Sequence, residues 1–129
     1  MIDRYREMDI VTASPTTLVV KLYEGALRNA FEARRQIELG CIPARAVAID
    51  KALAIVAELQ GSLDFEQGGE IAPQLHDLYH FVTQRLLEAN RDASTRAIDD
   101  AVGVLEILLE AWQQLAGNPV PQPNAEAAR

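Results

Sequence analysis

Residues 12–26 read Thr-Ala-Ser-Pro-Thr-Thr-Leu-Val-Val-Lys-Leu-Tyr-Glu-Gly-Ala, and this stretch decides the fold. Its start suits a helix, because the Ser14 hydroxyl can accept from the free N–H groups of a first turn and Pro15 fits the first helical position. Two adjacent lines of apolar residues then recur at helical spacing. The first line is Leu18, Leu22, Ala26, Ala30, Ala33 and Ile37, and the second is Val19 or Val20, Tyr23, Leu27 and Phe31. Two such lines predict a helix that has neighbours on more than one side.

Three further helices follow the first, because prolines, glycines and capping residues divide the remaining apolar periodicity. Gly40 suits the end of the first helix, and Pro43 suits the first turn of the second. Asp92 or Ser94 is expected to cap the fourth helix. We expect the helices at about residues 15–39, 43–63, 70–91 and 95–116, with a loop at residues 65–69. The fold class is therefore predicted as all-α, an antiparallel up-down four-helix bundle.

The predicted helical bundle, residues 14–117, is flanked by two segments of different composition. Residues 1–13 form a predicted non-helical arm with apolar side chains among charged ones. Such an arm suits either a segment pinned onto the bundle or a lid that can leave a groove. Residues 118–129 begin with alternating prolines, which remove backbone donors, so we predict a disordered tail. At 129 residues, the chain is expected to form one domain.

The formal net charge is −7, and Cys41 is the single cysteine of the sequence. The negative charge argues against nucleic acid and against an anionic membrane surface as partners. One cysteine excludes an internal disulfide and suits a reducing compartment. No apolar run approaches about 20 residues, and the N-terminus has no signal-peptide core, so we expect a cytoplasmic protein without membrane insertion.

No sequence motif indicates catalysis or cofactor binding, so we predict no enzyme activity and no cofactor. His76 and His80 share a helix face, but no third ligand has matching spacing, so two solvated histidines are favoured over a metal-binding enzyme. A di-iron bundle site needs Glu-x-x-His on two helices, and the sequence lacks this motif. Gly68 and Gly69 are interpreted as a turn, because Glu70 stands where an anion would bind. The residues alone predict a helical binding module.

Several short motifs stand in a fixed order along the chain. They are Tyr5, Val11-Thr12-Ala13-Ser14-Pro15, Leu22-Tyr23-Glu24-Gly25-Ala26, Ser62-Leu63-Asp64, Gly68-Gly69-Glu70-Ile71-Ala72 and Leu86-Leu87-Glu88-Ala89-Asn90. In this order and at this spacing, the motifs resemble those of the FliS family of flagellar secretion chaperones. Leu75 and Tyr79 also fall at matching points, and the resemblance runs from Tyr5 to about Trp112. Each motif alone is weak, whereas the ordered set is specific.

The resemblance implies a cytoplasmic export chaperone that binds the C-terminal segment of flagellin, prevents premature polymerisation and keeps flagellin competent for flagellar type III secretion. It also implies that the arm, from Met1 to about Val11, covers part of the hydrophobic surface. Deleting this arm is then expected to leave the fold intact and to strengthen client binding. The flagellar export gate is a further candidate partner, and we expect a monomer or a weak homodimer. The alternative is a self-associating helical adaptor or structural bundle without a flagellin client.

The candidate partner contacts are apolar residues of the arm and of the helices. They are Tyr5, Ile10, Leu22, Tyr23, Ile49, Leu53, Val56, Ile71, Leu75 and Tyr79. Core positions remain the alternative for the helical residues among them, because spacing alone does not separate a groove from a core. Caps and turns are assigned to Ser14, Pro15, Gly25, Gly68, Gly69 and Asn90.

Overall fold

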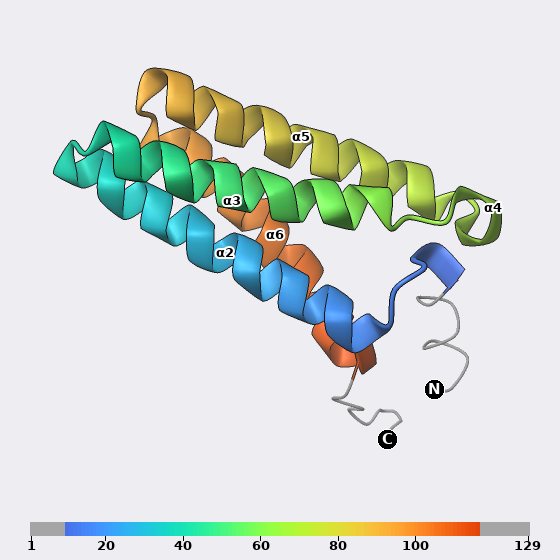
Figure 1. The fold of residues 1–129 in the computed structure, drawn as a ribbon. Helices are drawn as coiled ribbons and strands as arrows, with labels where there is room; N and C mark the ends of the chain where they lie inside the picture. The colour runs from blue at the N-terminus through green and yellow to red at the C-terminus, as the bar shows by residue number, and fades with distance from the viewer. Residues whose placement is uncertain (1–9, 117–129) are drawn as a thin grey trace.

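The computed structural model describes residues 10–116, and long helices make up most of this part of the chain (Figure 1). They are α2 (Thr16–Leu39), α3 (Ile42–Gly61), α5 (Ile71–Asp92) and α6 (Thr95–Ala116), and the short α4 (Phe65–Gly68) lies between α3 and α5. Helix α2 packs on α3, α3 on α5 and α5 on α6, and α6 returns to α2. This closed ring of neighbours confirms the predicted all-α four-helix bundle.

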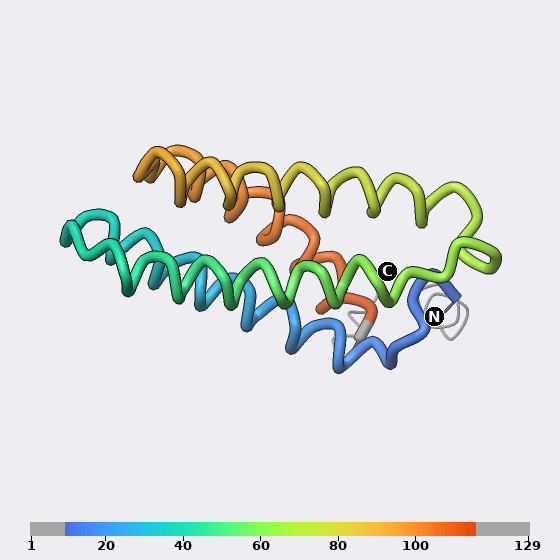
Figure 2. Tube along the Cα trace, turned by 45° about the horizontal axis from the view of Figure 1, so that its top comes forward, coloured from blue at the N-terminus to red at the C-terminus, as the bar shows by residue number. Residues whose placement is uncertain are grey.

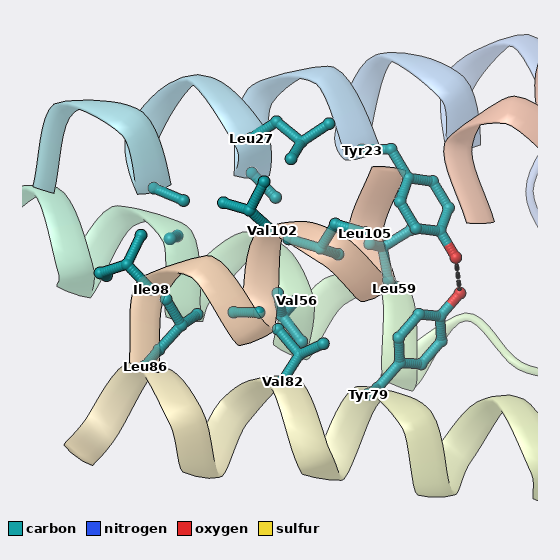
Figure 3. Close-up of a cluster of buried hydrophobic side chains, with 14 of the residues drawn as sticks. Tyr23, Leu27, Val56, Leu59, Tyr79, Val82, Leu86, Ile98, Val102 and Leu105 are labelled. Atoms are coloured by element: carbon teal, nitrogen blue, oxygen red, sulfur yellow. Dashed lines mark hydrogen bonds between the residues drawn. The ribbon is translucent and has the colours of Figure 1, made fainter. Parts of the chain in front are cut away.

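The core consists of the facing apolar stripes of the four long helices (Figure 3). Its largest fully buried side chains are Trp112, Tyr23, Tyr79, Ile49, Leu59, Leu86, Ile98 and Leu105. Each buried aliphatic side chain of this size contributes about 1.5–3 kcal/mol to folding. Small residues fill the closest contacts: a Cβ added to Gly25 would lie 3.2 Å from Cδ1 of Ile55. Gly25 therefore lies inside α2 as a helix-contact residue, and its assignment to a cap or turn was wrong.

Several helix ends follow the sequence prediction. Gly40 ends α2 in the left-handed conformation, with φ +75°, as predicted for a C-terminal glycine. The Ser94 hydroxyl accepts a hydrogen bond from the Ala97 N–H, 3.0 Å between the two heavy atoms, so Ser94 rather than Asp92 caps α6. Pro43 lies in the first turn of α3, where a missing N–H breaks no helical hydrogen bond.

Two other helix ends differ from the prediction. Pro15, with φ −58° and ψ 145°, is the N-cap of α2 and lies outside the helix, and no side-chain hydrogen bond caps this end. The Thr12 hydroxyl donates to the Ser14 carbonyl at 3.0 Å, which holds a turn before the helix begins. Helix α5 ends at Ala93, whose φ is +52°, so Asn90 is a helical residue rather than a cap.

Residues 65–69 were expected to form a loop, but residues 65–68 form the helix α4. The Asp64 carboxylate accepts a hydrogen bond from the Gln67 N–H at 3.0 Å, and this cap supplies the local reason for the helix. Gly69 follows with φ +58°, which confirms the predicted sharp turn. Gly68 has a different role: a Cβ there would lie 3.2 Å from Cα of Val11 and 3.0 Å from Cβ of Ala72.

The end of the arm is part of the bundle. Ile10 and Val11 have helical backbone, and Thr12 forms an antiparallel bridge with Leu63. The Ala13 N–H donates to the Ser62 carbonyl at 2.7 Å, and the Asp64 N–H donates to the Val11 carbonyl at 2.6 Å. Val11 is also buried in the core. The expectation of a non-helical arm through Ala13, removable through Val11, was therefore wrong at its inner end. Residues 1–9 and 117–129, including Tyr5 and the predicted stop at Gly117, lie outside the described residues.

Side-chain pairs cross between helices at the opposite end of the bundle. Arg34 of α2 pairs with Asp99 of α6, and Arg85 of α5 pairs with Asp100 at 3.5 Å. Arg45 of α3 donates to the Asn90 carbonyl of α5 at 2.9 Å. Because both ion pairs are about half exposed, each contributes roughly 1 kcal/mol or less, and their main effect is to fix the helix register.

One polar network lies inside the core. The hydroxyl oxygens of Tyr23 and Tyr79 are 2.5 Å apart and point toward each other from α2 and α5 (Figure 3). Trp112 of α6 packs beside Tyr23, with 6.4 Å between the ring centroids. Burial raises the pKa of Tyr79 to about 12, and burial together with the charge of Tyr79 raises the pKa of Tyr23 further. Both hydroxyls therefore stay protonated at neutral pH.

We expect Gly68→Ala to destabilise the fold by about 1–3 kcal/mol, because the new methyl group would press on the Val11 backbone. Gly103→Ala is the matched control, since a Cβ there meets nothing within 4 Å and alanine favours the helical backbone by about 1 kcal/mol. Urea unfolding of the two variants measures both changes. A Gly68→Ala protein as stable as the unmodified chain would show that the arm does not depend on this close contact.

We expect Tyr23→Phe and Tyr79→Phe each to destabilise the fold, because each substitution removes the hydrogen-bond partner of the remaining buried hydroxyl. Leaving a buried polar group unpaired costs about 1–3 kcal/mol. Thermal unfolding of the two single variants measures the loss, and an unchanged midpoint in either variant would contradict the stabilising role of this hydrogen bond.

The same pair predicts a pH dependence of stability. In the unfolded chain a tyrosine ionises near 10.0, whereas in the fold the pKa of Tyr79 is raised to about 12 and that of Tyr23 lies higher. The stabilisation is therefore complete below pH 10 and is lost as the pH rises from about 10 to 12. Unfolding free energies measured across this range should fall less steeply in the Tyr23→Phe/Tyr79→Phe double variant.

Candidate functional site

The histidine and cysteine residues do not come together as a metal site. Within residues 10–116, no three His, Cys, Asp or Glu side chains gather closely enough to hold a metal ion. His76 packs edge-on against Phe65, with 5.9 Å between ring centroids, and its Nδ1 lies 3.7 Å from the Asp77 carboxylate. Cys41 is exposed beside the turn between α2 and α3. We also find, among the helices of the described part, none whose length and hydropathy suit a membrane span.

Half of the predicted partner contacts are core residues. The buried set is Tyr23, Ile49, Val56, Leu75 and Tyr79. These side chains fill the space between helices, and the hydroxyls of Tyr23 and Tyr79 also hydrogen-bond to each other. A partner that docks on the outside of this bundle does not touch them.

Four of the other predicted contacts can be reached from outside. Ile10 and Ile71 are exposed, and Leu22 and Leu53 are half-buried with one side against the core. Tyr5 lies outside the described residues. The structure brings Ile10 near the start of α5, because Val11 contacts Gly68 and Gly68 contacts Ala72. Ile10 and Ile71 therefore belong to the same end of the molecule.

The structure also exposes large apolar side chains that the sequence analysis did not name as contacts. They are Leu18, Phe31, Leu39, Ile42, Val47, Phe65, Leu78, Phe81, Leu87 and Ile107. Leu18, Phe31 and Leu78 belong to predicted stripes but lie at their flanks, where no neighbouring helix covers them. Phe81 and Ile107 do not share the helical spacing of the buried residues on α5 and α6, and this was the available sequence signal. A large aromatic or branched side chain on a polar helix face indicates an interaction surface.

These exposed apolar residues do not gather on one helix. Helices α2, α3 and α5 each carry at least two of them, α6 carries Ile107, and α4 carries Phe65. The buried side chains of the four long helices form one core, so the surface is what the bundle offers to other molecules. Such a distribution suits an extended polypeptide that touches several helices better than a compact ligand held in one pocket.

The comparisons with known proteins agree with this geometry. A family model described as "Flagellar protein FliS" matches residues 1–119. The flagellar secretion chaperone FliS of Salmonella typhimurium is 38% identical over 111 residues, which cover 85% of this chain and 82% of that protein. The FliS of Campylobacter jejuni is 37% identical over 105 residues, 81% of this chain and 82% of the relative. The flagellar secretion chaperone FliSB of Pseudomonas aeruginosa is 33% identical over 110 residues, 85% and 87% of the two chains.

The family match extends over the arm and the whole bundle and is not confined to one helix. The matches also agree with the absence of a catalytic motif, because the relatives are named as chaperones. The chain belongs to the FliS family of flagellar secretion chaperones, which are chaperones and not enzymes.

Proposed function

We propose that this protein is a cytoplasmic chaperone that binds the C-terminal segment of flagellin, prevents its premature polymerisation and keeps it competent for flagellar type III secretion. Membership of a family of flagellar secretion chaperones supports an export client. The observation that carries the proposal is the spread of exposed apolar side chains over all four long helices of a bundle whose core is already filled.

An apolar segment that assembles into a filament aggregates when it is exposed, and a chaperone prevents this by covering it. A disordered client that folds as it binds can wrap a wide surface with modest affinity per unit area, which suits a cargo that is later released. Ile71 at one end of α5 and Leu87 near its other end are both exposed. A client of this kind would need to follow the length of the bundle to cover both.

Calorimetric titration with the C-terminal peptide of the same organism's flagellin tests the proposal. We expect saturable one-to-one binding with a large negative heat-capacity change, because apolar surface is buried as the client orders. A scrambled peptide of the same composition is the control and should not saturate. If neither peptide binds, the flagellin proposal fails, and a concentration-dependent sedimentation coefficient would then favour the self-associating adaptor.

We also propose that residues 1–9 act as a lid that competes with the client. A surface that is covered part of the time binds with an apparent affinity lowered by that fraction. The lid must end before Val11, since Val11 is a core residue bonded to Asp64. This end point differs from the deletion through Val11 that the sequence suggested.

Deleting residues 1–9 is therefore expected to strengthen flagellin-peptide binding several-fold while the thermal midpoint stays the same. Val11→Ser is the contrasting variant and should lower the thermal midpoint, because it removes apolar contacts from the core. Unchanged or weaker binding after the deletion would contradict the lid.

A further inference from the structure

An ion pair identifies one edge between α5 and α6. Arg85 of α5 and Asp100 of α6 are 3.5 Å apart across the outside of this helix pair. Residues four and seven positions away on a helix share a face with the starting residue. On α5 these positions before Arg85 are Phe81 and Leu78, and on α6 the same positions after Asp100 are Val104 and Ile107. Because the two helices are antiparallel, both rows run from the ion pair in the same direction.

The rows are apolar and largely uncovered. Leu78 is 37% exposed, Phe81 44% and Ile107 71%, whereas Val104 packs partly against the core. Ile71, two heptads before Arg85 on α5, is 48% exposed and extends the row. Helices α5 and α6 lie side by side near the turn that joins them and diverge toward their other ends in both views (Figures 1 and 2). Leu78, Phe81 and Ile107 stay exposed, although other apolar side chains of the two helices share the core. We call this surface, residues 71, 78, 81, 104 and 107, the α5–α6 edge.

The charges beside the α5–α6 edge have one sign. Residues 70–84 and 97–116 contain no Lys or Arg. The Asp77 side chain, four residues before Phe81, is 87% exposed, and Glu110, three residues after Ile107, is exposed as well. Arg85 at the end of the edge already pairs with Glu88 and Asp100. The edge therefore presents an apolar row bordered by carboxylates, with His76 as the neighbour of Asp77.

The exposed apolar residues of the opposite helix pair have mixed surroundings. Leu39, Ile42 and Val47 of α2 and α3 are exposed. The sequence around them holds both signs, with Arg35 and Glu38 on one side and Asp50 and Lys51 on the other. This contrast separates the α5–α6 edge from the other apolar surface of the bundle and provides a matched control.

We propose that the α5–α6 edge docks an amphipathic helix of a partner protein whose apolar stripe is bordered by Lys and Arg. Apolar anchors at helical spacing fit a row of this length, as in other helix-on-groove contacts. Basic side chains on both borders complement Asp77 and Glu110, steer the encounter and exclude acidic helices. The edge is part of the exposed apolar surface that supports the flagellin proposal, but its preference for a basic helix follows from its own charges and is tested without flagellin.

The test is calorimetric titration of the full chain with two synthetic amphipathic helices that share one leucine stripe. One peptide has lysines beside the stripe and the other has glutamates in their place. We expect one-to-one binding of the lysine peptide, roughly tenfold or more weaker binding of the glutamate peptide, and a loss of affinity between about 50 and 300 mM NaCl. No binding of the lysine peptide, or equal binding of both peptides, overturns the proposal.

Two variants locate the contact. Ile107→Asp should weaken the lysine peptide roughly tenfold or more, as truncation of a central anchor does. Ile42→Asp alters an isoleucine of the other helix pair that is 62% exposed, against 71% for Ile107, and should change affinity less than about twofold. Equal effects of the two variants overturn the proposal. Sedimentation of the unmodified chain can show a dimer that Ile107→Asp converts to a monomer. In that case the edge is a contact between copies of this chain, and the proposal is likewise wrong.

The titration with synthetic peptides and the titration with the flagellin peptide can fail independently. The synthetic peptides contain no flagellin sequence, so a failed flagellin titration leaves their result unaffected. Asp77→Lys combined with Glu110→Lys should reverse the preference toward the glutamate peptide, since these carboxylates supply the complementarity. An unchanged preference in this double variant overturns the charge argument.

Discussion

Small side chains at the helix contacts set how closely the four helices can approach, and the rest of the structure depends on this spacing. Ala26, Ala30 and Ala33 of α2 are fully buried, and Gly25 leaves just enough room for Ile55 of α3. At this separation Tyr23, Tyr79 and Trp112 fill the wider interior at one end. The bundle therefore completes its own core, and a partner must use the side chains that remain outside.

The two ends of the bundle are held by different forces. Near the α2–α3 and α5–α6 turns, arginines on three helices pair across the surface. At the other end, the arm and the α3–α4 turn exchange backbone hydrogen bonds. Helices α5 and α6 diverge toward this second end, and Ile71 and Ile107 stay exposed there. Part of the exposed apolar surface thus lies where these two helices diverge, and Leu39 and Ile42 are exposed at the other end.

Periodicity and helix-end chemistry predicted the number of long helices, most of their ends and most of the core. The predictions failed where long-range contacts decide the outcome. Tyr23 and Tyr79 match the family motifs, but they meet each other across 56 residues of sequence and lie in the core. Leu78 and Phe81 were not predicted as contacts, yet both are exposed. Stripe position alone does not encode where a neighbouring helix ends its contact.

The backbone bridge between Thr12 and Leu63 has a kinetic consequence. It closes a loop of about fifty residues that contains the whole α2–α3 hairpin, and ordering so long a loop carries a large entropy loss unless the hairpin has already formed. Attachment of the arm is therefore a late step in folding, and its release is an early step in opening. We infer that this bridge can open before the four long helices separate, and that its opening uncovers Val11.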